Sequence, residues 1–342
     1  MTRIVFRDFD EFTDALGGVI GKFVPTARST EEWWVQSVTT GGVLTQILQV
    51  GSQATFAGDG KRDEIALQIP LTDPAKTRID GQCLEQDSFL LIKEGHPFTL
   101  STSAATRWAG IVVPTEHELL APELMESLMS RLFYKRTTSR ADTNAEHLDR
   151  IRFLVARLSA AADSISLNAA TVACAQEEII AAVSLALEAS SRAQPRQFGR
   201  PSFSRSRVIA RILALIEAST GAPLLIHDLC RATGMAERTL RNICHEYFGV
   251  GPIRLLKVRQ LREIRAALLA ADPTHEMVTH IAIRFGIWDL SLFSRNYKAL
   301  FGESPSSTLR TVSTRARPDF TVRDTWLHYA TRAFSSEACD VD

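Results

Sequence analysis

The spacing of hydrophobic positions divides the chain into a β-rich part and a helical part. Between Trp33 and Val113, short alternating apolar runs are separated by turn-forming Gly, Asp and Pro residues. This pattern is typical of antiparallel strands in a small sandwich or barrel. A short helix is expected before it, from Phe9 to Leu16. The first part of the chain is therefore expected to be a β sandwich or barrel.

Leu, Ile and Val recur at helical spacing after Pro114, which predicts two long helices, through residues 148–158 and 179–187. The segment 191–207 lacks apolar periodicity and is rich in Ser, Arg, Pro and Gly, as linkers are. Helical spacing then returns and continues to about Leu309. The expected organisation is one domain at 1–190, β-rich at 33–113 and helical at 114–190, then the linker, a helical domain at 208–310, and a tail at 311–342 with no assigned role.

The composition is that of a folded, water-soluble protein. At 342 residues the chain is too long for one ordinary core, and 45% hydrophobic with 23% charged residues is average usage. The five cysteines are scattered, which indicates neither a disulfide framework nor a paired-cysteine metal site. The acidic N-terminus and the absence of an 18-residue apolar run exclude a signal peptide and a membrane span. We expect a cytoplasmic protein with no membrane partner, no metal and no cofactor.

The zero net charge hides a difference between regions. Residues 205–310 hold 15 Lys and Arg against 9 Asp and Glu, whereas residues 1–204 hold 20 against 25. A locally basic domain suits phosphate attraction, although the same excess also fits many proteins that never touch DNA.

An internal repeat is the most informative feature of the helical domain. Shifting residues 226–252 by 52 positions aligns Leu229, Gly234 and Met235 with Ile281, Gly286 and Ile287. A shift one residue longer aligns the rest of the unit, and the pairs are Leu240 with Phe293, Cys244 with Tyr297, Phe248 with Phe301, Gly249 with Gly302, and Pro252 with Pro305.

Each copy predicts a helix, a glycine turn and a second helix that ends at Phe-Gly, which is the pattern of a helix-turn-helix unit. The predicted helices are 226–232 and 237–248 in the first copy and 278–285 and 289–301 in the second. A long apolar-faced helix at 253–270 separates the copies and would span about 27 Å, suited to placing two recognition helices in successive major grooves. For either unit alone, an ordinary helical hairpin in a core remains an alternative.

Residues from about 224 to 309 resemble the C-terminal DNA-binding domain of AraC/XylS-family transcription regulators. In that family the second unit reads Ile-Ala, three residues, Gly-Phe, then Phe-Ser-Arg-x-Phe-Lys and Phe-Gly-x-x-Pro. Trp288 stands where the family commonly has a small or polar residue. The corresponding stretches here are Ile281-Ala282, Gly286-Ile287, Phe293-Ser294-Arg295-Asn296-Tyr297-Lys298 and Phe301-Gly302-Glu303-Ser304-Pro305.

The resemblance implies which side chains read DNA and which hold its backbone. Arg favours guanine, Asn favours adenine, and an apolar side chain such as Leu290 can meet a thymine methyl group. The base-reading candidates are Arg238, Arg241, Asn242, His245, Leu290, Ser291, Ser294 and Arg295. The phosphate candidates, for which solvated surface charge is the alternative, are Lys257, Arg259, Lys298 and Arg310.

By the same resemblance, residues 1–190 are the sensor and dimerisation domain, with a cupin-like barrel or sandwich. The His residues are too scattered for a cupin metal site. An effector such as an organic acid or a nucleotide would be held by aromatic residues and Arg, with core packing as the alternative role for most of them. The pocket candidates are Trp33, Trp34, Phe56, Arg78, Phe98, Arg107 and Trp108.

These inferences together predict an α+β protein: a cupin-like β domain with flanking helices, then an all-α domain of two helix-turn-helix units joined by a long helix. The expected function is an effector-responsive activator that binds promoter or operator DNA as a homodimer, with RNA polymerase as a further candidate partner. The apolar stripes of the helices at 146–190 suit a dimer contact, and packing on their own barrel is the alternative. Two other functions remain open, a cupin-type enzyme with an accessory helical domain and an architectural DNA-binding protein without an effector.

Overall fold

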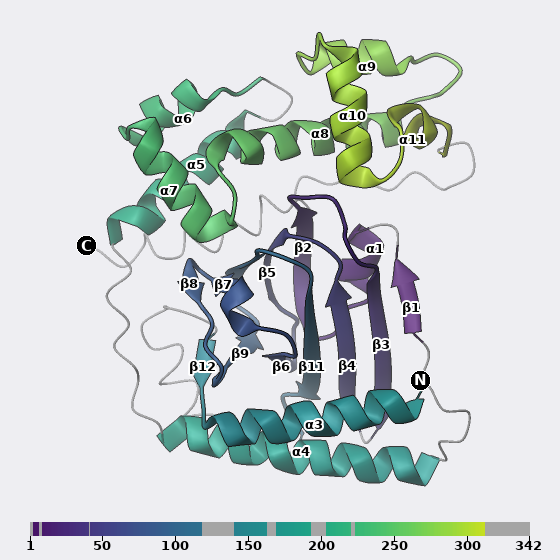
Figure 1. The fold of residues 1–342 in the computed structure, drawn as a ribbon, viewed down its shortest axis with the longest axis vertical. Helices are drawn as coiled ribbons and strands as arrows, with labels where there is room; N and C mark the ends of the chain where they lie inside the picture. Colours follow the sequence, from purple (N-terminus) through teal and green to yellow (C-terminus); the bar gives the residue numbers. More distant parts are fainter. Residues whose placement is uncertain are drawn as a thin grey trace.

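The structure, a computed structural model, describes residues 3–6, 9–40, 42–117, 140–162, 169–192, 203–219 and 223–311. A β sandwich lies between two long helices, α3 and α4, and the helical C-terminal domain (Figure 1). The predicted α+β fold class is confirmed. The tail beyond Thr311 and most of the predicted linker lie outside the described residues.

The sandwich consists of two antiparallel sheets. The larger has the strand order β1-β3-β4-β11-β6-β9-β12, and the smaller has the order β2-β5-β10-β7-β8. The strands of the larger sheet are β1 (Arg3–Phe6), β3 (Trp33–Thr40), β4 (Val43–Val50), β11 (Thr106–Pro114), β6 (Glu64–Pro70), β9 (Ser88–Lys93) and β12 (Arg140–Asp142). Those of the smaller sheet are β2 (Val19–Pro25), β5 (Ala54–Gly60), β10 (Phe98–Thr102), β7 (Thr77–Ile79) and β8 (Gln82–Cys83).

The central strands of the larger sheet are covered on both faces, which explains the apolar runs of β6, β9 and β11. Along β9, Phe89 and Leu91 pack toward helices α3 (Ala145–Ala162) and α4 (Ala169–Arg192), while Leu90 and Ile92 face the smaller sheet. Successive side chains of a strand point to opposite faces, so a sheet covered on both sides needs apolar residues at every position. Helix α1 (Phe9–Asp14) closes one end of the sandwich with Phe12.

Seven helices in the described part of the chain form the C-terminal domain. They are α5 (Phe203–Ala218), α6 (Ile226–Thr233), α7 (Glu237–Phe248), α8 (Pro252–Ala270), α9 (Val278–Arg284), α10 (Leu290–Phe301) and α11 (Pro305–Thr311). Their buried apolar side chains make one cluster, which runs from Ile209 of α5 through Leu261 of α8 to Phe293 of α10. None of the helices in the described ranges combines the length and apolarity needed to cross a membrane.

Two boundaries differ from the sequence-based expectations. Strands β1 and β2 precede Trp33, where the β-rich region was expected to begin. Strand β2 contains Gly21, Lys22 and Pro25, which weaken the strand signal but are tolerated at the edge of a sheet. Helix α5 begins at Phe203, inside the predicted linker, because Ser and Arg dominate its first turn and obscure the helical periodicity.

Candidate nucleic-acid interface and ligand cavity

The first helix-turn-helix unit consists of α6 and α7 joined at Gly234. This glycine has a φ of 70°, and Gly249, which ends α7, has a φ of 66°. A Cβ added at Gly234 would meet nothing within 4 Å, so the left-handed backbone and not a lack of space requires glycine there. The turn therefore fixes the angle at which α7 leaves α6.

The second unit repeats this geometry with α9 and α10. Gly286 in the turn and Gly302 at the end of α10 both have a φ of 75°. Helix α10 also has a side-chain cap, because Asp289 Oδ1 accepts a hydrogen bond of 2.8 Å from the Leu292 amide. The pairs aligned by the sequence repeat, Leu229 with Ile281, Leu240 with Phe293 and Cys244 with Tyr297, are all buried. The repeat is thus a repeat of core positions.

Helix α8 connects the two units as a strut. Its 19 residues span about 28 Å at the usual helical rise. Gln260 Nε2 donates a 2.7 Å hydrogen bond to the Phe285 carbonyl at the end of α9, and Arg265 Nε lies 3.5 Å from Glu303 Oε1 beyond α10. At its other side, Arg259 Nη2 donates to the Ser219 carbonyl after α5 at 2.6 Å. These contacts hold both units on one rigid element.

The polar side of α7 is exposed. All four candidates on it, Arg238, Arg241, Asn242 and His245, are accessible to solvent. Arg241 Nη2 donates to Glu237 Oε1 at 2.8 Å, an ion pair one helical turn apart on the surface. We call this surface of α7 the first reading face.

The corresponding side of α10, the second reading face, is also open. Ser291, Ser294 and Arg295 are exposed, and Leu290 is half-buried. Buried on the other side of the helix are Phe293, Tyr297 and Leu300, which pack into the domain core. Both reading faces therefore combine an accessible surface with a buried anchor.

The four phosphate candidates fall into two groups. Lys298 and Arg310 are exposed. Arg259 is engaged inside the domain with Ser219 and Glu263, and only 12% of its side chain is exposed. Lys257 is half-buried beside Gln260, and desolvation lowers the pKa of its ammonium group. The first two are thus accessible to solvent, while the other two make contacts within the helical domain.

The smaller sheet of the sandwich packs against the first unit and the strut. Thr55 Oγ1 donates to the Phe248 carbonyl at 3.1 Å, and Gln53 Nε2 donates to the Gly249 carbonyl at 2.9 Å. The Arg254 guanidinium donates to the Thr26 carbonyl through Nε and Nη2, at 3.0 and 2.8 Å. Arg262 Nη1 donates to the Phe23 carbonyl at 3.0 Å. The end of α7 and the start of the strut are thus fixed to strands β2 and β5.

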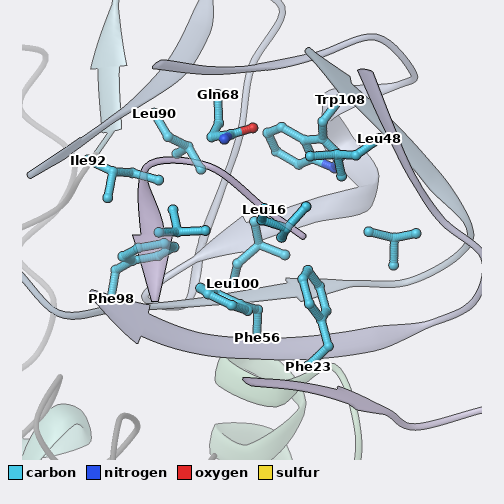
Figure 2. A pocket seen from close by; sticks show the side chains of 12 residues that line it. Leu16, Phe23, Leu48, Phe56, Gln68, Leu90, Ile92, Phe98, Leu100 and Trp108 are labelled. Carbon is cyan, nitrogen blue, oxygen red and sulfur yellow. The ribbon is translucent and has the colours of Figure 1, made fainter. Parts of the chain in front are cut away.

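An apolar cavity lies between the two sheets (Figure 2). Its volume is about 40 Å³. Its one polar side chain is Gln68, which points inward between Leu90 and Trp108. The other lining residues are Leu16, Val19, Phe23, Leu48, Val50, Phe56, Ile92, Phe98 and Leu100. None of the described residues that line it is charged.

The seven pocket candidates from the sequence do not lie together. Phe56, Phe98 and Trp108 line the cavity. Trp33 packs behind it, 5.6 Å from the ring of Phe23. The remaining three lie elsewhere: Trp34 in the core under α3 and α4, Arg107 stacked over Trp34 and bonded to Gln49, and Arg78 bonded to the Gly81 carbonyl. The expected cationic anchor is therefore absent from the cavity lining.

Comparison with known proteins identifies the C-terminal domain. Residues 229–311 match the model of a helix-turn-helix domain family. The chain is 39% identical over 100 residues to a probable thc operon regulatory protein of Rhodococcus erythropolis, and 32% identical over 112 residues to the XylDLEGF operon transcriptional activator of Pseudomonas putida. The C-terminal domain belongs to the AraC/XylS family. The aligned regions cover 29% and 33% of this chain, and 30% and 33% of those two relatives.

Two solved structures also resemble the chain. The AraC-like transcriptional activator CuxR aligns over 77% of this chain and 94% of its own, with a TM-score of 0.40 and 13% identity. ToxT from Vibrio cholerae aligns over 79% and 98%, with a TM-score of 0.27 and 13% identity.

Sequence reasoning missed the residues that attach the AraC/XylS-type domain to the sandwich. Arg254 and Arg262 looked like ordinary basic residues of an amphipathic helix, and their acceptors are backbone carbonyls more than 200 positions away. Gln68 was also missed, although a single polar residue within the otherwise apolar run 65–70 of β6 is a usable signal.

Proposed function

We propose that this protein is a sequence-specific DNA-binding transcription regulator rather than an enzyme. The observation that carries the proposal is the pair of exposed reading faces, each anchored by the same buried positions and both fixed to one strut. Helix-turn-helix proteins insert such helices into the major groove, and successive grooves on one side of a duplex lie about 34 Å apart. The strut length of about 28 Å is compatible with that spacing.

The chemistry of the exposed side chains suggests their roles. Arg238, Arg241 and Arg295 offer bidentate donors for guanine, and Asn242 offers the amide pattern that suits adenine. His245, Ser291 and Ser294 add shorter polar contacts. We assign the exposed side chains of Lys298 and Arg310 to phosphate contacts, which would add affinity and salt dependence without sequence preference.

Replacing Arg241 with alanine tests the first reading face. We expect specific binding to weaken by about 1–3 kcal/mol and the preference at one base position to relax, because a bidentate base contact is lost. Selection from random duplexes followed by titration measures both effects. Arg150→Ala on α3, which also removes an exposed arginine, should change neither. An unchanged site preference in the Arg241 variant would remove Arg241 from the reading set.

We further propose that the cavity binds the effector, and that the effector is a small neutral molecule. The lining is apolar except for Gln68, whose amide can both donate and accept hydrogen bonds. A carboxylate or phosphate would be desolvated there without a counter-charge, which is strongly unfavourable. The lining therefore supports an uncharged aromatic or aliphatic molecule with at most one polar group.

Strands β2 and β5 connect the cavity to the first helix-turn-helix unit, so a change in the cavity lining could alter the position of the first reading face. Phe23 and Phe56 line the cavity with their side chains. The Phe23 carbonyl accepts the bond from Arg262, while Thr55, next to Phe56, holds the end of α7. Figure 2 shows a helix below the strands that carry Phe23 and Phe56. A ligand that moves Phe56 would shift the residues that hold the first unit.

Binding of small aromatic molecules tests both the cavity and its connection to the first unit through Thr55. Toluene and phenol should raise the melting temperature of the protein, and benzoate should not, because its carboxylate would be buried without a counter-charge. At a hundred times its Kd a ligand adds about 2.7 kcal/mol to the unfolding free energy. Gln68→Leu should weaken the binding of phenol and leave the binding of toluene unchanged. A larger shift with benzoate than with toluene would contradict the neutral effector.

Thr55→Val tests the connection. This variant should keep toluene binding but abolish any effect of toluene on DNA affinity.

We propose that the protein works in the cytoplasm as a homodimer that activates transcription. The name of the Pseudomonas putida relative supports activation, and contact with RNA polymerase would follow from it. The outer side of α3 and α4 supports dimerisation, since Phe153 and Leu185 are each 54% exposed there. The predicted stripes are not available for this contact, because Leu148, Ile151, Val155, Leu158, Ile179, Val183 and Leu187 are all buried against the larger sheet.

A further inference from the structure

Trp288 is the most exposed large hydrophobic side chain in the described part of the chain. Its relative exposure is 80%, although its neighbour Ile287 is buried. It lies in the turn between α9 and α10, directly before the cap residue Asp289. Large aromatic side chains are seldom left in water, and an exposed one on a binding domain marks a contact surface.

The surroundings of Trp288 make the second reading face chemically different from the first. Leu292 of α10 is 44% exposed and Ile283 of α9 is 39% exposed. Leu290, at the start of α10, is half-buried. The first unit has no counterpart of Trp288, because the N-cap residue Ala236 of α7 corresponds to Asp289 of α10, and the first turn of α7 carries Glu237 and Arg238. One unit thus begins with charged side chains and the other with apolar ones.

DNA offers one prominent apolar group in the major groove, the 5-methyl group of thymine. The turn and the first half of a recognition helix are the parts that reach base edges. Arg295 and Lys298, exposed farther along α10, supply the positive charge that favours a polyanion over an apolar protein surface.

We propose that Trp288 is a specificity-determining residue that, with Leu290, reads thymine methyl groups in the half-site under the second unit. The inference rests on the proposed DNA-binding function and deepens it. The first unit reads hydrogen-bonding base edges, and the second adds methyl groups to the polar contacts of Ser291, Ser294 and Arg295, so the two halves of the operator differ in composition. That difference fixes the direction in which one protomer lies on the duplex.

Uracil substitution tests this assignment, because deoxyuridine differs from thymidine only by the missing methyl group. After the preferred site has been selected from random duplexes, each thymine is replaced singly. We expect replacement in the second half-site to weaken wild-type binding about fourfold for each methyl group contacted. Replacement in the first half-site should have no such effect. The Trp288→Ala protein should bind the thymine and uracil duplexes equally at the affected position.

Met277→Ala is the matched control. Met277 is 56% exposed at the start of α9 in the same unit, and its variant should keep the fourfold difference. Equal wild-type binding to both duplexes overturns the methyl-reading proposal and leaves the regulator proposal intact. An undiminished uracil effect in Trp288→Ala overturns the role of Trp288, and combined with reduced transcription activation it assigns the side chain to a protein partner. A complete lack of sequence preference in the selection overturns the proposed function itself.

Discussion

Replacing Phe293 with alanine should lower the unfolding free energy of the C-terminal domain by about 3–5 kcal/mol. Phe293 is 1% exposed, and its ring contacts that of Tyr297 edge-on at 5.6 Å between centroids. Removing the ring leaves a cavity under α10 that the strut cannot fill, because α8 is fixed by its own contacts with α5 and α9. Urea unfolding followed by helical circular dichroism measures the loss.

The neighbouring residue provides the control for this prediction. Leu292→Ala removes a comparable apolar side chain from a position that is 44% exposed, so its effect on stability should stay within about 0.5 kcal/mol. Because one apolar cluster includes both units, the Phe293 variant should still unfold in a single transition and should destabilise α7 as well. Equal stability of the two variants, or a separate transition for the second unit, would contradict this description of the core.

The helical domain could be predicted closely from the sequence because its signals are local. Gly234, Gly249, Gly286 and Gly302 each occupy a left-handed position, which few other residues tolerate. The periodicity of α7 and α10 separates a buried side from an open one without any knowledge of partners. The exposed candidates on both reading faces were therefore found before the fold was known.

The lining of the cavity could not be predicted in the same way. In strands that are buried on both faces, apolar residues occupy both sets of alternating positions. The sequence then does not tell which side chains point into the sandwich and which point toward the helices. Trp33 and Trp34 illustrate this ambiguity, because one packs near the cavity and the other under the helices. The same limit applied to the stripes of α3 and α4, whose pattern suited a dimer contact and a barrel contact equally.

Charge alone was also an incomplete guide to the phosphate candidates. Arg259 and Lys257 lie on the strut at positions that look exposed in the sequence. In the structure, Arg259 donates a hydrogen bond to the Ser219 carbonyl after α5, and Lys257 donates one to Gln260. Long basic side chains bury their stems readily and can bind backbone carbonyls that no sequence pattern reveals. Which arginine is accessible to a ligand is therefore decided by tertiary contacts.

Phe153→Glu should separate the proposed dimer and lower the affinity for paired half-sites by about 10²- to 10⁴-fold, because the second protomer then binds as an independent molecule. Affinity for a single half-site should stay unchanged, since α3 lies on the far side of the sandwich from the reading faces (Figure 1). Phe153 is 54% exposed, so the added charge costs the monomer little. Light scattering at micromolar concentration and titration on single and paired sites measure both effects. Arg62→Glu, at a side chain that is 81% exposed in the turn between β5 and β6, should change neither mass nor affinity. A wild-type protein that stays monomeric with and without DNA would exclude the homodimer and the four reading faces it brings to one operator.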